Sequence, residues 1–232
     1  LLGTDRIHLF DTPLLMCRNQ GLSMEQRAAK RVLDIIVSGL GIIVSSPIML
    51  IIAIAVKAYD GGPVFYLQDR LTYQGKEFRI RKFRSMCVDS EKNGARLASK
   101  HDSRITPVGH VLRNLHLDEL PQMFNVFMGD MSLVGPRPER DVIMQEYEQE
   151  IPEFHYRLKV KAGLTGYAQV YGKYNTTPYD KLKLDLFYIE NYSFLLDIKL
   201  LFMTVKIFFQ KEVSEGVDDN QKNALKDSEE KK

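Results

Sequence analysis

The chain has 232 residues and nearly balanced charge, with 32 Lys and Arg against 30 Asp and Glu and a formal net charge of +2. This length suits one domain with a core of its own, and the near-neutral charge argues against a nucleic-acid-binding role. The two cysteines, Cys17 and Cys87, stand far apart in no metal-ligand pattern, which is typical of a protein in a reducing compartment.

Residues 1–29 precede the first long apolar stretch and combine short apolar pieces with turn-forming residues. The chain opens LLGTDRIHLF, without an initiating Met. We therefore expect residues 1–29 to be a linker that follows an N-terminal region of a longer protein.

The stretch 32–56 is apolar apart from Asp34. As a helix it would be roughly 37 Å long, enough to cross a hydrocarbon core of about 30 Å. Ser46 and Pro47 fall in its middle, where proline removes a helical hydrogen bond and a neighbouring hydroxyl can take up the freed carbonyl. Basic residues flank both ends, so their charge does not force the ends apart. Three structures stay open for residues 30–58: a re-entrant helix that breaks at Ser46-Pro47, a straight span and a buried core helix.

From Asp60 onward the composition becomes that of a soluble, mixed and helix-rich α/β domain, which we expect to cover residues 59–210. Alternating strands, turn residues and helix-start signals define its elements. They are, in chain order, a β-hairpin of strands 64–70 and 77–86 with its turn at 74–76, a polar loop at 88–104, a helix from Thr106-Pro107 toward Leu115, a helix and turn at 122–134, an acidic solvated helix at 140–150, and a Gly-rich strand-and-turn segment at 158–172.

Two further helices follow. Residues 178–191 form an amphipathic pattern, whereas residues 194–211 are apolar nearly all round, with Lys199 and Lys206 among the interruptions. Such spacing is typical of an interfacial helix in the headgroup plane, and a buried core helix is the alternative. Residues 211–232 are charged and poor in apolar residues, which predicts a disordered tail.

The clearest chemical feature is a pair of adjacent carboxylates, Asp118 and Glu119. Arg113 precedes them by five residues, and Arg137 lies between two prolines that restrict its backbone. Phosphoryl transfer needs such a set: one carboxylate attacks or holds Mg²⁺, its neighbour moves a proton, and arginines neutralise phosphate oxygens. From spacing alone, a helix end whose acids pair with Arg113 and solvent is the open alternative.

Several separate motifs together resemble one family, the bacterial sugar transferases, which are monotopic phosphoglycosyl transferases also called polyprenyl glycosylphosphotransferases. The resemblance covers about residues 30 to 210, and the pairing of LDELPQ with GDMSLVGPRP makes it specific. The matching strings are KRVLDIIVSG with SSP, GGPVFYLQDR, KFRSM, DSRIT, LRNLHLDELPQMFNVFMGDMSLVGPRP, KAGLTGYAQVYG and YIENYSFLLDIKL.

The resemblance implies transfer of a sugar 1-phosphate from a UDP-sugar to undecaprenyl phosphate, with release of UMP. This reaction begins exopolysaccharide, capsule or other surface-glycan synthesis at the cytoplasmic face of the bacterial inner membrane. The implied partners are the UDP-sugar, undecaprenyl phosphate and membrane lipids, with Mg²⁺ as cofactor and a homodimer left open. The resemblance also favours the re-entrant structure of the helix at Ser46-Pro47.

The family motifs also imply roles for individual residues. Asp118 would be the nucleophile that forms an aspartyl-phosphosugar intermediate and a ligand of Mg²⁺, and Glu119 its acid/base partner. The implied phosphate- and substrate-binding residues are Arg137, Arg113, Lys82, Arg84 and Arg104.

This chain departs from the family pattern at two positions. Ala162 stands where the family usually has Pro, and Thr72 stands where Gly is common. Neither position lies in the acid pair. No motif identifies the sugar or the glycan.

Two other functions stay open. A Mg²⁺-dependent phosphodiesterase or nucleotidyltransferase would use Asp118 and Glu119 only as metal ligands. A membrane-bound scaffold would use the basic cluster 79–84 to bind anionic lipid and would not need Asp118.

Overall fold

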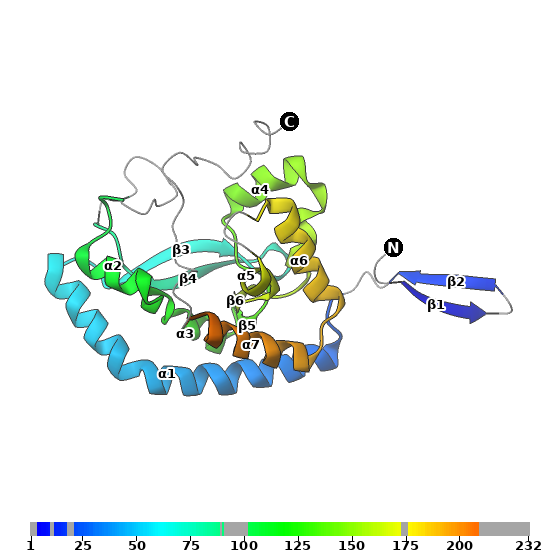
Figure 1. Cartoon of the computed structure of the whole chain (residues 1–232), viewed down its shortest axis with the longest axis horizontal. Helices are drawn as coiled ribbons and strands as arrows, with labels where there is room; N and C mark the ends of the chain where they lie inside the picture. The colour runs from blue at the N-terminus through cyan, green and yellow to red at the C-terminus, as the bar shows by residue number, and fades with distance from the viewer. Residues whose placement is uncertain are drawn as a thin grey trace.

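The computed structural model describes residues 4–9, 12–17, 21–88, 90, 102–172 and 176–208. Short strands and many helices make a mixed, helix-rich α/β structure, as expected (Figure 1). Residues 211–232 and most of the predicted loop 88–104 lie outside the described residues.

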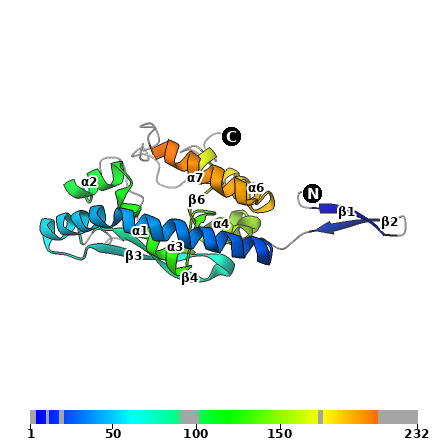
Figure 2. The same ribbon diagram turned by 90° about the horizontal axis from the view of Figure 1, so that it is seen from below.

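Helix α1, Met24–Asp60, is the longest element and runs along one face of the molecule (Figure 2). It begins six residues before the expected membrane segment, because Ser23 and Gln26 form a capping box. It ends at Gly61, whose φ of +70° is readily adopted by glycine. Pro47 lies inside α1, and Figure 1 shows the helix bending past its middle.

The hydroxyl beside Pro47 takes the role expected of it. Proline has no N–H, so the carbonyl of Ile43 loses its helical donor. The Ser46 hydroxyl donates to this carbonyl at 2.8 Å. The Ser45 hydroxyl donates to the carbonyl of Gly41 at 2.6 Å. The helix therefore stays continuous through the proline.

Most of α1 is not buried, and one helix of the described chain is long and apolar enough to cross a membrane. A buried core helix is therefore not what the structure contains. Large apolar side chains point away from the protein along both halves of the helix: Val32, Ile36, Leu40, Ile43, Val44, Leu50, Ile51 and Ile54.

The soluble domain contacts both halves of α1. Near the N-terminus, Lys30 donates to Asp197 at 2.6 Å and to the Tyr188 hydroxyl at 3.0 Å in a buried network. Near the other end, Met49, Ile52 and Val56 pack with Phe83 and Leu112 in a core cluster.

Antiparallel strands β3, Phe65–Leu71, and β4, Glu77–Phe83, form the predicted hairpin. Its turn is the 3-10 helix η1, Tyr73–Gly75. A second, parallel pair joins β5, Ser132–Val134, to β6, Gly163–Thr165. Strands β1, Thr4–Leu9, and β2, Thr12–Cys17, pair antiparallel within the expected linker.

The remaining helices lie around β3 to β6 (Figure 1). They are α2 (Pro107–Asn114), η2 (Leu117–Glu119), α3 (Gln122–Met128), α4 (Asp141–Glu150), η3 (Pro152–Lys159), α5 (Tyr167–Tyr171), α6 (Pro178–Glu190) and α7 (Phe194–Phe208). The expected helices at 106–115, 140–150 and 178–191 are confirmed, and the one expected at 194–211 is confirmed over its described residues, 194–208. The sequence did not predict η3, α5 or the parallel pairing of β5 with β6.

Helix α7 is apolar on its outer side as well as on the inner side that packs into the core, where Leu200 is fully buried. Asp197 is fully buried, and Lys30 and Tyr188 bind it. Leu195 and Phe202 are 76% and 74% exposed. An apolar outer face beside that of α1 is what an interfacial helix presents to lipid.

Candidate active site

The acid pair lies in η2, a single 3-10 turn between α2 and α3. His116, at the start of this turn, has a left-handed backbone with φ of +52°. Pro121 is the N-cap residue of α3, and proline is tolerated at the start of a helix. The tight turn places Asp118 and Glu119 next to strand β4, from which Lys82 reaches them.

Glu119 is held by two cations. Lys82 Nζ lies 2.6 Å from Glu119 Oε1, and Arg137 Nη2 lies 3.2 Å from the same oxygen. Burial by itself would raise the pKa of Glu119, but Arg137 and Lys82 outweigh it and lower this pKa to about 2. Glu119 is therefore ionised at neutral pH, and the charge of Glu119 raises the pKa of Arg137 in turn.

Asp118 has a different environment. Its carboxylate accepts no hydrogen bond from any described residue, although Lys82 and Arg113 attract it electrostatically. Burial, and then the neighbouring charge of Glu119, raises its pKa above the usual range. The oxygens of Asp118 are left free of donors from the described part of the chain, which suits a nucleophile or a metal ligand.

The other predicted cations are divided between this site and structural contacts. Arg113 donates from Nε to the Ser85 hydroxyl at 2.9 Å, and burial, opposed by the charge of Asp118, lowers its pKa. Arg104 binds Asp102, with Nη2 to Oδ2 at 2.6 Å. Arg84 is 7% exposed and pairs with Asp60 at the end of α1, with Nη1 to Oδ2 at 2.8 Å.

Thus Lys82, Arg113 and Arg137 surround the acid pair, whereas Arg84 ties the hairpin to α1. No sequence motif indicates that residues 60 and 84 pair. The sequence alone therefore could not show that Arg84 has a structural role whereas Lys82, two residues earlier, contacts the acid pair. The structure brings Arg104 into the electrostatic surroundings of Arg113 and Asp102.

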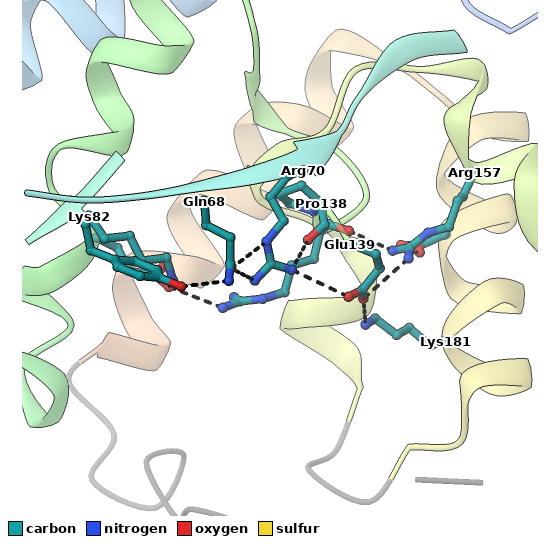
Figure 3. Close-up of polar contacts among 11 residues, drawn as sticks. Gln68, Arg70, Lys82, Pro138, Glu139, Arg157 and Lys181 are labelled. Carbon is teal, nitrogen blue, oxygen red and sulfur yellow. Dashed lines mark hydrogen bonds and ion pairs between the residues drawn. The ribbon is translucent and has the colours of Figure 1, made fainter. Parts of the chain in front are cut away.

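A second group of charges, which the sequence analysis did not identify, surrounds Glu139, two residues after Arg137 (Figure 3). Glu139 is its centre: its carboxylate lies 2.5 Å from Lys181, 3.5 Å from Arg157 and 3.9 Å from Arg70. Asp185, 1% exposed at its side chain, pairs with Arg157 at 2.7 Å. These residues come from separate elements, so no local pattern unites them. The one sequence feature that could have pointed to this group is Glu139, an acidic residue that directly follows Pro138.

Glu139 makes folding stability depend on pH. Burial would raise its pKa, but Lys181 and Arg157 lower it to about 2, against an ordinary value of 4.5. A carboxylate whose pKa falls on folding stabilises the protein above its unfolded pKa, and this stability is lost as pH falls toward its folded pKa. We expect the wild type to lose on the order of 3 kcal/mol between about pH 4.5 and about pH 2 through this group.

The Glu139→Gln protein should lack that part of the acid-induced loss of stability. The difference in free energy of unfolding between the wild type and this variant should therefore shrink as pH falls. The measurement is the free energy of unfolding in detergent, followed by far-UV circular dichroism. Glu146→Gln, at an exposed position of α4, is the control and should follow the wild type. If the difference in free energy of unfolding between the wild type and Glu139→Gln stayed constant across this pH range, Glu139 would not be the source of the pH dependence.

The donor set fits Mg²⁺ bound jointly with a substrate. The described residues contain no cluster of three or more His, Cys, Asp or Glu side chains that could hold a metal ion alone. Magnesium at phosphate-transfer sites commonly uses one or two carboxylates together with substrate phosphates and water. Asp118 can supply such an oxygen, because no described side chain donates to it.

Comparison with known proteins gives a single answer. The model of the family described as "Bacterial sugar transferase" matches residues 25–211. A protein of Aeromonas hydrophila named UDP-N-acetylgalactosamine-undecaprenyl-phosphate N-acetylgalactosaminephosphotransferase is 44% identical over 180 residues, covering 76% of this chain and 43% of that protein.

Two other relatives carry the names of other sugars. A UDP-glucose:undecaprenyl-phosphate glucose-1-phosphate transferase of Klebsiella pneumoniae is 43% identical over 208 residues, covering 88% of this chain and 43% of the relative. An undecaprenyl-phosphate galactose phosphotransferase of Salmonella typhimurium is 36% identical over 230 residues, covering 91% and 47% respectively. The chain spans less than half the length of these relatives.

Proposed function

Because this chain belongs to the bacterial sugar transferase family, we propose that it transfers a sugar 1-phosphate from a UDP-sugar to undecaprenyl phosphate and releases UMP. The relatives named above act on UDP-sugars or undecaprenyl phosphate according to their names. The feature of this chain that carries the proposal is the contrast within the acid pair. Asp118 is free of donors among the described residues, whereas Glu119 is fixed and ionised between Lys82 and Arg137.

In the first step, an oxygen of Asp118 attacks the phosphorus that bears the sugar. The new bond joins Asp118 to phosphorus, and the bond between that phosphorus and the bridging oxygen breaks, so UMP leaves with the bonding electrons. Arg137, whose side chain is 47% exposed, can neutralise phosphate oxygens as charge develops on them.

In the second step, an oxygen of undecaprenyl phosphate attacks the same phosphorus and releases Asp118. Glu119 is the proposed acid/base partner: Arg137 and Lys82 lower its pKa to about 2, so it can accept a proton from the incoming phosphate once the phosphate oxygens draw these cations away from it. The two steps let a water-soluble donor and a lipid acceptor use one phosphate site in turn. Bound Mg²⁺ would supply charge neutralisation at the diphosphate, with Asp118 among its ligands.

Helix α1 supports a proposal for how the protein sits on the membrane. We propose that α1 enters the cytoplasmic face of the bacterial inner membrane and returns to that face after bending at Pro47. Lys30 and Asp60, near its two ends, both bind residues of the same soluble domain. A straight crossing would place one of these ends on the far side of the bilayer from its partner. The exposed apolar faces of α1 and α7 would contact lipid.

The proposal is tested by measuring UMP release from a panel of UDP-sugars with Mg²⁺ and undecaprenyl phosphate. We expect repeated UMP release, beyond one UMP per protein, to depend on the lipid and on one sugar of the panel, which identifies the donor. The panel should include the glucose, galactose and N-acetylgalactosamine donors, since relatives differ in this respect. Lipid-independent hydrolysis would instead indicate a phosphodiesterase, and binding to anionic vesicles without turnover would indicate a scaffold.

A further inference from the structure

The residues Pro136–Glu139, here called the strap, carry Arg137 to the acid pair. Two of its four residues are prolines, which have no N–H, so the backbone must be held mainly through its carbonyl oxygens. All four carbonyls accept a hydrogen bond. The donors are Gly163 N to Pro136 O at 2.9 Å, Arg157 Nη2 to Arg137 O at 3.0 Å, Arg70 Nη1 to Pro138 O at 3.1 Å, and Leu71 N to Glu139 O at 3.0 Å.

Arg70 is oriented for this contact by its own strand. Its Nε and Nη2 both donate to Gln68 Oε1, at 3.0 and 2.6 Å, and Gln68 donates to the Tyr66 hydroxyl at 2.8 Å. These residues alternate along β3, so their side chains share one face. The remaining Nη1 of Arg70 therefore points to the strap, where Pro138 O and Glu139 lie (Figure 3).

Arg157 holds the strap from the opposite side. Its side chain is 2% exposed, and it is fixed by Asp185 at 2.7 Å and Glu139 at 3.5 Å. From this position it donates to the carbonyl of Arg137. A charged donor gives a stronger hydrogen bond than a neutral one, so the two guanidinium groups are the firmest attachments of the strap.

The side chain of Arg137 has no comparable support. Among the described residues its one ion pair is with Glu119 at 3.2 Å, and 47% of the side chain is exposed. The position of its guanidinium therefore depends on the backbone beneath it. We propose that Arg70 and Arg157 are positioning residues that act through Arg137. They hold the strap in place, so that the guanidinium of Arg137 contacts the phosphate being transferred.

This inference rests on the proposed function, and a double-mutant cycle tests it. Arg70→Met should lower kcat/KM for UMP release by about 10- to 100-fold in the wild-type background. In an Arg137→Ala background the same change should cost less than about twofold, because its effect passes through the side chain already removed. A role in general stability would lower the rate in both backgrounds. Arg70 is the better test residue, since removing Arg157 leaves the buried Asp185 unpaired.

Arg79→Met is the matched control. Arg79 lies on the same hairpin, but its side chain is 72% exposed and pairs with Asp69 on the surface. It should change kcat/KM by less than about twofold in either background, as surface ion pairs contribute little.

Hydrogen exchange of the wild-type and variant proteins gives a second readout that needs no activity. Arg70→Met should speed exchange at the amides of Leu71 and Gly163, which donate to carbonyls of the strap, whereas Arg79→Met should leave it unchanged. Equal exchange in the two variants, or an additive cost in the cycle, would overturn the inference. If the wild type is active but the two substitutions lower kcat/KM additively, the inference fails and the proposed function stands. If the wild type never releases UMP, the proposed function fails. Hydrogen exchange still tests whether Arg70 holds the strap in that case.

Discussion

Asp118→Asn should reduce sugar-phosphate transfer by about four orders of magnitude or more, because it removes the proposed nucleophile. Asparagine has nearly the same shape as aspartate, and no described residue donates to the Asp118 carboxylate. The substitution therefore breaks no hydrogen bond of the described structure. It also removes a carboxylate whose burial raises its pKa, so the variant should fold at least as stably as the wild type.

The measurement is UMP release at saturating donor and acceptor, together with mass spectrometry of the peptide that contains Asp118. Wild-type protein incubated with donor alone should carry a sugar phosphate on this peptide, and hydroxylamine should remove it, since it cleaves acyl phosphates. Asp69→Asn makes the same chemical change at an exposed hairpin position and should retain activity. Turnover of the folded Asp118→Asn protein within about tenfold of the wild type would refute covalent catalysis.

The double variant Ser46→Leu, Pro47→Leu should separate the two ends of α1 across the membrane and abolish transfer. The change Pro47→Leu restores a backbone N–H donor to the Ile43 carbonyl, so the bend would lose its cause. A straight helix of 37 residues spans roughly 55 Å, longer than a hydrocarbon core of about 30 Å. The exposed apolar side chains of both halves would then favour a single crossing.

Single reporter cysteines, introduced as Glu25→Cys or Tyr59→Cys, test this change of topology in chains whose Cys17 and Cys87 have been changed to Ser. An impermeant thiol reagent should label both reporters from the cytoplasmic side in the parent chain and from opposite sides in the double variant. Ile48→Leu, which keeps the proline, should behave as the parent. Parent reporters labelled from opposite faces would contradict the re-entrant seat.

The two departures from the family pattern illustrate what contacts add to a sequence. Thr72 and Ala162 lie 90 positions apart, yet Ala162 N donates to Thr72 Oγ1 at 3.1 Å, and this hydroxyl donates to the carbonyl of Asp130 at 2.9 Å. Proline at position 162 would have no N–H to satisfy, and glycine at position 72 would have no hydroxyl to accept it. The two substitutions therefore match each other, and we expect Thr72→Gly to leave a buried donor unpaired.

The sequence by itself determined the local features, because these depend on neighbouring residues. The hairpin, the capped helices α2 and α6, and the hydroxyl beside Pro47 follow from alternation, capping residues and proline chemistry. The acid pair was also visible, since its two carboxylates are adjacent in the chain. Family membership, stated as a resemblance, is confirmed.

Only the tertiary structure decided which distant charges meet. It paired Arg84 with Asp60 at the end of α1, left Lys82 with Glu119, and brought Arg70 and Arg157 together around Glu139. Coulombic attraction depends on distance in space and not on separation along the chain, so no spacing rule could assign these partners. The acid pair is thus encoded locally, whereas the arrangement of cations around it arises from packing between remote elements.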